Sequence, residues 1–197
     1  MRSLTLKALP AALLLLLGAS AAQAGWQDHA SQFDAQRLSR LDEARTKALS
    51  EASAGGDIST IQSVVDPAGR APSGSDLAGS WRCRTIKIGG ITPSVVYSWF
   101  NCRISNRGGG WFLQKTSGSQ RMAGYLYPGD GGLVYLGAST VKGEPTRAYS
   151  GNGASVGAQA TPDDQIGLLT MIGQGHARIE MPFPVQESTM DVLELKR

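Results

Sequence analysis

The second half of the chain alternates between hydrophobic and polar residues with a period of two, which is typical of β-strands with one buried face. The runs cover residues 77–84, 100–104, 111–115, 122–127, 133–137, 155–160, 166–172, 177–181 and 189–196. Glycine, proline and serine are frequent between the runs, so the connections are expected to be tight turns. We predict a mainly β domain, an antiparallel meander of eight or nine strands that closes into a barrel, with a two-sheet sandwich as the alternative.

Residues 26–54 follow a different period, with apolar side chains every three to four positions, which predicts an amphipathic helix. The positions on this stripe are Leu38, Leu41, Arg45, Leu49 and Ala52. Gly55 and Gly56 end the helix, and a short second helix ends at Asp66-Pro67. Because the stripe is narrow and rich in alanine, we expect the helical segment to pack on another surface instead of folding alone.

The first 24 residues have the pattern of a secretory signal peptide. Arg2 and Lys7 precede the apolar run Ala8–Leu17, and Ala22-Gln23-Ala24 supplies a small-x-small cleavage site. The apolar run is too short to span a bilayer, which takes about twenty residues. We therefore expect a periplasmic or secreted protein whose mature chain begins at Gly25.

These patterns divide the chain into four parts. They are a signal peptide over 1–24, a helical N-terminal appendage over 25–66, a linker over 67–76 and a β-barrel domain over 77–197. Without Arg2 and Lys7, the 19 basic residues become 17, against 16 acidic ones. This near-neutral balance gives no reason to expect a nucleic-acid partner, and the mature chain contains no apolar run of membrane-spanning length.

Cys83 and Cys102 are the two cysteines of the chain. An even number in an exported protein favours a disulfide, and the alternatives are a metal pair or a reactive thiol. The midpoint between them falls within Gly89–Pro93, which is typical of a hairpin turn. A regular hairpin about this centre predicts that the two cysteines lie directly opposite each other, within disulfide reach.

Sequence motifs for catalysis and for metal or cofactor binding are lacking. His29 and His176 are the two histidines, without the spacing of a metal site, and no Gly-x-Ser-x-Gly run occurs. Gly151-Asn152-Gly153 begins like a dinucleotide fingerprint, but Val156 stands where the third glycine belongs. We expect no metal and no cofactor. A glycosidase-like hydrolase is still an alternative, because it needs two carboxylates that lie close together. The candidates for such a pair are Glu180, Glu187, Asp191 and Glu194.

Two features are candidates for contact with a small molecule or a protein partner. Lys115 and Arg121 flank a turn that contains Ser117 and Ser119, where backbone N–H groups and two cations can hold an anionic group. A polar hairpin tip is the alternative interpretation. The second feature is an excess of strand aromatics over what one small barrel interior requires. These aromatic candidates are Tyr97, Trp99, Trp111, Tyr125 and Tyr127.

The parity of the strands assigns side chains to faces. We place the cysteines inside the barrel, together with Trp81 and Phe100, which share their faces. Tyr97 and Trp99 then lie outside, and we expect Leu38, Leu41 and Leu49 of the helix to cover them.

The run Leu77–Cys83, with Gly79 and Trp81, resembles the opening strand of lipocalin-like barrels. It is also similar to small exported barrel inhibitors of bacterial metalloproteases, which have a tryptophan-bearing first strand and one disulfide. Four longer stretches resemble a family of exported bacterial proteins known only as a domain of unknown function. They are Trp81–Ile88, Lys115–Pro128, Leu133–Ala138 and Glu187–Arg197. This resemblance extends over most of the mature chain and implies no activity.

We predict an exported, non-enzymatic binding protein that holds a small ligand or a protein partner, with a protease-inhibitor-like module second and a hydrolase third. A ligand binder predicts a closed cavity lined by aromatic side chains. An inhibitor predicts a filled core with a protruding edge or N-terminal segment. A hydrolase predicts that His176 or two carboxylates converge in a cleft.

Overall fold

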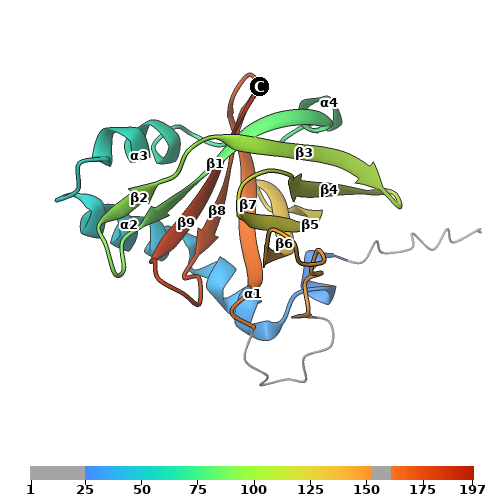
Figure 1. The fold of residues 1–197 in the computed structure, drawn as a ribbon, viewed down its shortest axis with the longest axis horizontal. Helices are drawn as coiled ribbons and strands as arrows, with labels where there is room; N and C mark the ends of the chain where they lie inside the picture. The colour runs from blue at the N-terminus through green and yellow to red at the C-terminus, as the bar shows by residue number, and fades with distance from the viewer. Residues whose placement is uncertain (1–24, 152–160) are drawn as a thin grey trace, which may run out of the picture.

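Eight antiparallel strands follow one another around a closed barrel in the computed structural model, which describes residues 25–151 and 161–197 (Figure 1). Pairing of β1 with β9 closes the barrel, and β2 is an additional strand on β1. The strands are β1 (Gly79–Ile88), β2 (Ser94–Val96), β3 (Phe100–Arg107), β4 (Gly110–Lys115), β5 (Gln120–Gly129), β6 (Gly132–Val141), β7 (Asp164–Gly173), β8 (His176–Pro182) and β9 (Met190–Lys196). The predicted meander barrel is confirmed, and the strand expected over 155–160 lies outside the described residues.

The disulfide between Cys83 and Cys102 is confirmed, but the two residues are not directly opposite each other. Cys83 faces Phe100 and Cys102 faces Trp81, so the predicted register is wrong by two residues. The hairpin is centred earlier than expected, because the Gly89 N–H donates to the Pro93 carbonyl at 2.9 Å. The cysteines therefore bond diagonally, with their Cα atoms 5.8 Å apart.

Apolar side chains fill one end of the barrel interior around the disulfide. Trp81, Cys83 and Cys102 lie in this core, and Phe100 packs against it, as the strand parity predicts. The Trp81 indole N–H donates to the Leu77 carbonyl at 2.9 Å, which satisfies its polar atom in a buried position. Further along the same strands, the inward positions change from apolar to polar.

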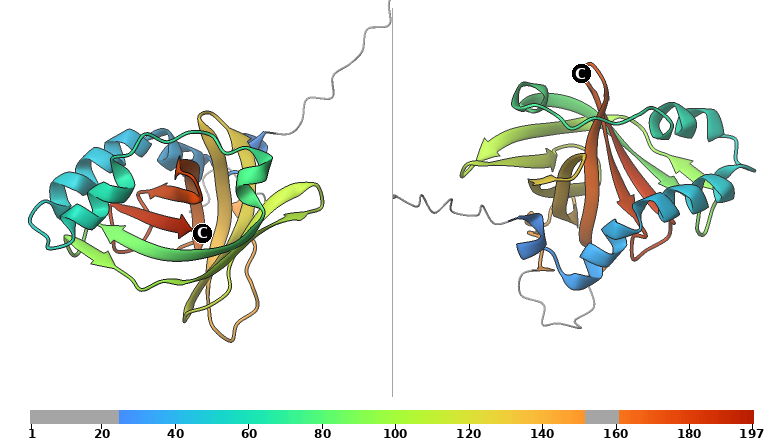
Figure 2. Two further views of the ribbon diagram at one scale, coloured as in Figure 1. Left: turned by 90° about the horizontal axis from the view of Figure 1, so that it is seen from above. Right: turned by 180° about the vertical axis from the view of Figure 1, so that it is seen from behind.

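Five short helices precede the barrel in the described residues, and the first three lie where the sequence predicts one continuous helix over 26–54. They are η1 (Trp26–Asp28), α1 (Gln32–Ser39), α2 (Leu41–Ala52), α3 (Ile58–Val65) and α4 (Gly74–Leu77). The Ser31 hydroxyl caps α1 by accepting from the Asp34 N–H, and Arg40 leaves the helical conformation between α1 and α2. These interruptions let the segment follow the curved side of the barrel (Figure 2).

The helices cover the outward side of β1 and β9. Leu41 and Leu49 pack with Ile86 and Val192, whereas Leu38 packs against a separate cluster on β6 and β7. The prediction that these leucines cover Tyr97 and Trp99 is therefore wrong. No helix within residues 25–151 and 161–197 has the length and hydrophobicity needed to cross a membrane.

Three cations surround the Trp99 ring instead. Arg84, Lys196 and Arg82 lie 4.7, 5.4 and 5.8 Å from its centroid. The helices cover the part of the β1–β9 ladder where the outward positions are aliphatic, at Ile86, Ile88, Met190 and Val192.

Candidate functional site

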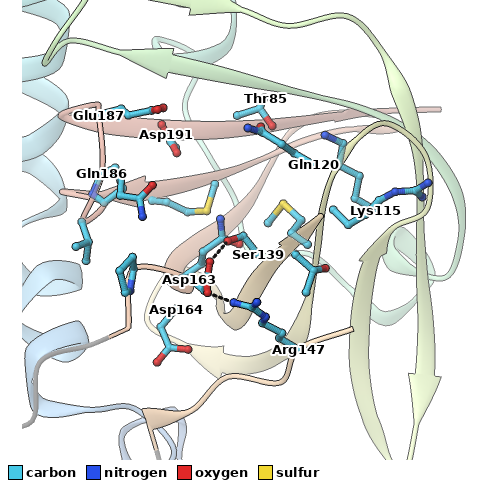
Figure 3. Close-up of a pocket in the computed structure, with 18 of the residues that line it drawn as sticks. Thr85, Lys115, Gln120, Ser139, Arg147, Asp163, Asp164, Gln186, Glu187 and Asp191 are labelled. Carbon is cyan, nitrogen blue, oxygen red and sulfur yellow. Dashed lines mark hydrogen bonds and ion pairs between the residues drawn. The ribbon is translucent and has the colours of Figure 1, made fainter. Parts of the chain in front are cut away.

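The end of the barrel interior away from the disulfide core contains a cavity of about 330 Å³, which we call the cup (Figure 3). Its lining includes Thr85, Lys87, Lys115, Gln120, Arg121, Met122, Ser139, Arg147, Asp163, Gln165, Met181 and Asp191. On β1 the inward positions run from Trp81 and Cys83 in the core to Thr85 and Lys87 in the cup. The volume suits a small molecule. None of the described residues that line the cup is aromatic, so the cup is not the aromatic-lined cavity expected of a ligand binder.

Lys87 balances two carboxylates on one side of the cup. Its Nζ lies 3.1 Å from Glu187 Oε2 and 3.4 Å from Asp191 Oδ2. The Ser188 hydroxyl donates to Asp191 Oδ1 at 2.5 Å. Burial raises the pKa of Asp191, although Lys87 and Ser188 oppose this shift. The positive charge of Lys87 is therefore matched by carboxylates on this side of the cup.

Asp163 organises the opposite side (Figure 3). Its carboxylate accepts a 3.1 Å hydrogen bond from the Ser139 hydroxyl and pairs with Arg147. Arg147 also pairs with Glu144, at 3.1 Å. The positive charge of Arg147 is thus neutralised as well.

Lys115 and Arg121 differ from these groups, because neither forms an ion pair with any residue that the structure describes. Lys115 is 6% exposed, and its ammonium lies 4.4 Å from the centroid of the Phe100 ring. Burial lowers the pKa of Lys115, and the nearby positive charge of Arg121 lowers it further. The Arg121 Nε–H is buried without an acceptor. The cup therefore has one region of uncompensated positive charge.

The two serines between these cations lie outside the cup lining. The Ser117 hydroxyl accepts from the Asn101 N–H at 2.7 Å, and the Ser119 carbonyl accepts from the Lys142 N–H at 2.7 Å. Both contacts hold the β4–β5 connection against its neighbours. Of the four residues named for the predicted anion site, Lys115 and Arg121 line the cup, whereas Ser117 and Ser119 do not.

The aromatic candidates are distributed over three places. Trp111 packs against the core, and Trp99 lies among cations on the outside. Tyr125 and Tyr127 form an outer aromatic row, with Phe112 on Tyr125 at 4.9 Å and His29 stacked on Tyr127 at 4.5 Å between ring centroids. Tyr97 is half-buried, and its backbone N–H donates to the Thr85 carbonyl at 3.0 Å. Tyr125 and Tyr127 line a second cavity together with Phe112 and Tyr149, and the other three candidates do not line it.

Of the four carboxylates considered for hydrolysis, two lie together in the cup and two lie elsewhere. Glu180 binds Arg45 and Arg178 under the helices, whereas Glu194 binds Arg84 and His176 on the outer face. Glu187 and Asp191 share Lys87 at the cup. Over the described ranges, no three His, Cys, Asp or Glu side chains gather as a metal site would require.

Sequence reasoning missed Lys87, Arg147, Asp163 and Gln165 as cup residues. A usable signal existed for Lys87, because it continues the inward parity of Trp81 and Cys83 along β1. A charged residue at an inward strand position indicates a polar interior. Arg147 and Asp163 lie outside the strands and carry no such periodic signal.

A model of the family described as Domain of unknown function (DUF4893) matches residues 26–195, which include both the helices and the barrel. No curated protein and no solved structure matches the chain.

Proposed function

Since the chain belongs to this family of unknown function, whose description states no activity, we propose that it is an exported, non-enzymatic protein that binds a small ligand in the cup. The cup is the place where the barrel interior is hollow and polar. Eight-stranded barrels are just wide enough to hold one small ligand when side chains do not fill them.

The observation that carries this proposal is the presence of unsatisfied polar atoms in the cup lining. Arg121 Nε and Gln165 Oε1 are both buried without a hydrogen-bond partner. Buried polar atoms in native proteins nearly always have partners, because an unmet one costs about 1–3 kcal/mol. A bound molecule that supplies one acceptor and one donor would satisfy both atoms.

The sequence features support the same proposal. The Gly79 and Trp81 pair gives the first strand its likeness to lipocalin-like barrels, and lipocalins hold their ligands inside the barrel. Residues 1–24 have a signal-peptide pattern, and the disulfide is suited to an oxidising compartment. His176, Glu180 and Glu194 form their ion pairs outside the cup, and Glu187 and Asp191 within it both lie beside Lys87, which favours binding over hydrolysis.

Native mass spectrometry of the protein purified from producing cells tests this proposal. We expect a fraction of the wild-type protein to carry a small molecule. Thr85→Phe, which places a ring in the cup, should remove it, whereas Ser80→Phe on the exposed part of the same strand should not. Bare protein in all three preparations, together with an unchanged melting temperature across a library of small metabolites, would contradict the proposal.

A further inference from the structure

Five cations line the cup, and three of them have carboxylate partners. Arg37 binds Asp34 at 2.5 Å, and Lys87 and Arg147 bind the pairs described above. Lys115 and Arg121 are the other two, and neither forms an ion pair with a carboxylate of the described residues. The uncompensated charge is therefore local and does not reflect a generally basic cavity.

These two side chains come from the two strands of one hairpin. Lys115 is the last residue of β4 and Arg121 is the second residue of β5, with the short turn between them. The ladder between β4 and β5 ends at Gln114 and Ala123, whereas Lys115 still pairs with Cys102 on β3 and Arg121 pairs with Thr140 on β6. Lys115 has the inward parity of Leu113 and Arg121 has the parity of Tyr125 on the outer face, and both side chains line the cup at its mouth.

Keeping two like charges together at a buried position is unfavourable without an anion between them. The Phe100 ring offers Lys115 only a cation–π contact, which accepts no hydrogen bond in the way that an oxygen does. An oxyanion would accept from the Lys115 ammonium and from the Arg121 Nε–H, the atom that lacks an acceptor.

From this arrangement we infer that Lys115 and Arg121 form an anion-binding subsite, and that the ligand of the cup carries a carboxylate or phosphate group. This inference rests on the proposed function, because it names the chemical class of the molecule that the cup holds. The subsite lies at the mouth, so the anionic group anchors one end of the ligand and its remainder extends toward Gln165 in the lining.

The test measures the binding of inorganic phosphate and of acetate to the full mature chain by isothermal titration calorimetry, at constant ionic strength set with chloride. We expect wild type to bind at least one of the two anions. Lys115→Met and Arg121→Gln should each weaken that binding at least about tenfold, because a hydrogen bond to a charged group is lost. Arg103→Met is the matched control, because it removes one positive charge from an exposed position on β3 and should leave the affinity unchanged.

Two outcomes of the titrations would overturn the anion subsite. One is equal binding by wild type, Lys115→Met and Arg121→Gln, and the other is an equal loss in Arg103→Met, which would indicate attraction by net charge alone. A neutral or cationic molecule that copurifies with wild type and with Lys115→Met, but not with Thr85→Phe, would also overturn it while leaving the cup as a ligand site. An identical response of Thr85→Phe and wild type to both anions would reject the cup itself.

Discussion

The Arg45 guanidinium reaches from α2 across to β8 and binds the buried carboxylate of Glu180. Nε donates to Oε1 at 2.8 Å and Nη2 donates to Oε2 at 3.0 Å. Arg178 lies beside the same carboxylate, and it donates to the Val64 and Pro67 carbonyls at the end of α3. The helices are thus fastened to the barrel by a buried ionic network as well as by aliphatic side chains.

Arg45→Met should therefore weaken the attachment of the helices. The variant leaves the fully buried Glu180 with Arg178 as its remaining partner, and we expect a loss of about 1–3 kcal/mol in the free energy of unfolding. Urea denaturation measures this loss. The control is Arg40→Met, whose partner Glu43 is exposed, and which should cost less than about 1 kcal/mol. Equal effects of the two substitutions would show that the buried network does not stabilise the fold.

The disulfide closes a loop between residues that are 19 positions apart. Replacement of both Cys83 and Cys102 by serine should lower the free energy of unfolding by about 3 kcal/mol, because the unfolded chain gains conformational freedom. Denaturation of the oxidised and double-serine proteins under the same conditions measures the difference. Labelling of unreduced protein with a thiol reagent is the control, and two labelled cysteines would contradict the bond.

The alternation of apolar and polar residues with short turns between the runs is sufficient to predict the barrel, because it specifies consecutive antiparallel strands with one buried face. It could not predict the register of the first hairpin. That register depends on where the Gly89–Pro93 turn closes and on residues 97–99, which separate β2 from β3 along the chain that pairs with β1. A shift of two residues leaves each side chain on the same face of the sheet. Trp81 and the two cysteines therefore face the interior as predicted, although the predicted pairing of the cysteines is wrong.

The candidate site was only partly predictable for a related reason. Lys115 and Arg121 are close in sequence, and a local pattern was enough to select them. Arg147 and Asp163 reach the cup from the connection between β6 and β7, far in sequence from Lys87 on β1. Barrel closure brings these segments together, and nothing in the local sequence specifies that contact.

Trp81 and Trp99 should respond differently to truncation. Trp81 is 3% exposed in the core and donates to the Leu77 carbonyl, so Trp81→Ala should cost about 3–5 kcal/mol. Trp99 lies outside among Arg82, Arg84 and Lys196, where each cation–π contact is worth about 0.5–1 kcal/mol, so Trp99→Ala should cost about 1–2 kcal/mol. Thermal unfolding of both variants measures the difference. A greater loss for Trp99→Ala would contradict the assignment of the two faces.

Lys115→Met should stabilise the ligand-free protein at pH 7, in contrast to most substitutions of buried residues. Burial and Arg121 hold the pKa of Lys115 below its usual 10.5, so folding at pH 7 forces a charge into an unfavourable place. Methionine keeps the contact with the Phe100 ring without that charge, and we expect a gain of roughly 1 kcal/mol.

The pH dependence of this gain distinguishes a charge effect from a simple change in apolar contact. Between the lowered pKa in the folded state and 10.5 in the unfolded state, the unfolded chain binds more protons, so wild-type stability rises with pH. The advantage of Lys115→Met should therefore shrink as the pH rises from 7 toward 10.5. Urea denaturation at pH 7 and pH 10, in buffers free of phosphate and carboxylates, measures this change. Lys142→Met, which removes an exposed lysine just after β6, should show neither the gain nor its pH dependence. A Lys115→Met protein that is less stable than wild type at pH 7 would mean that the folded barrel already neutralises this ammonium.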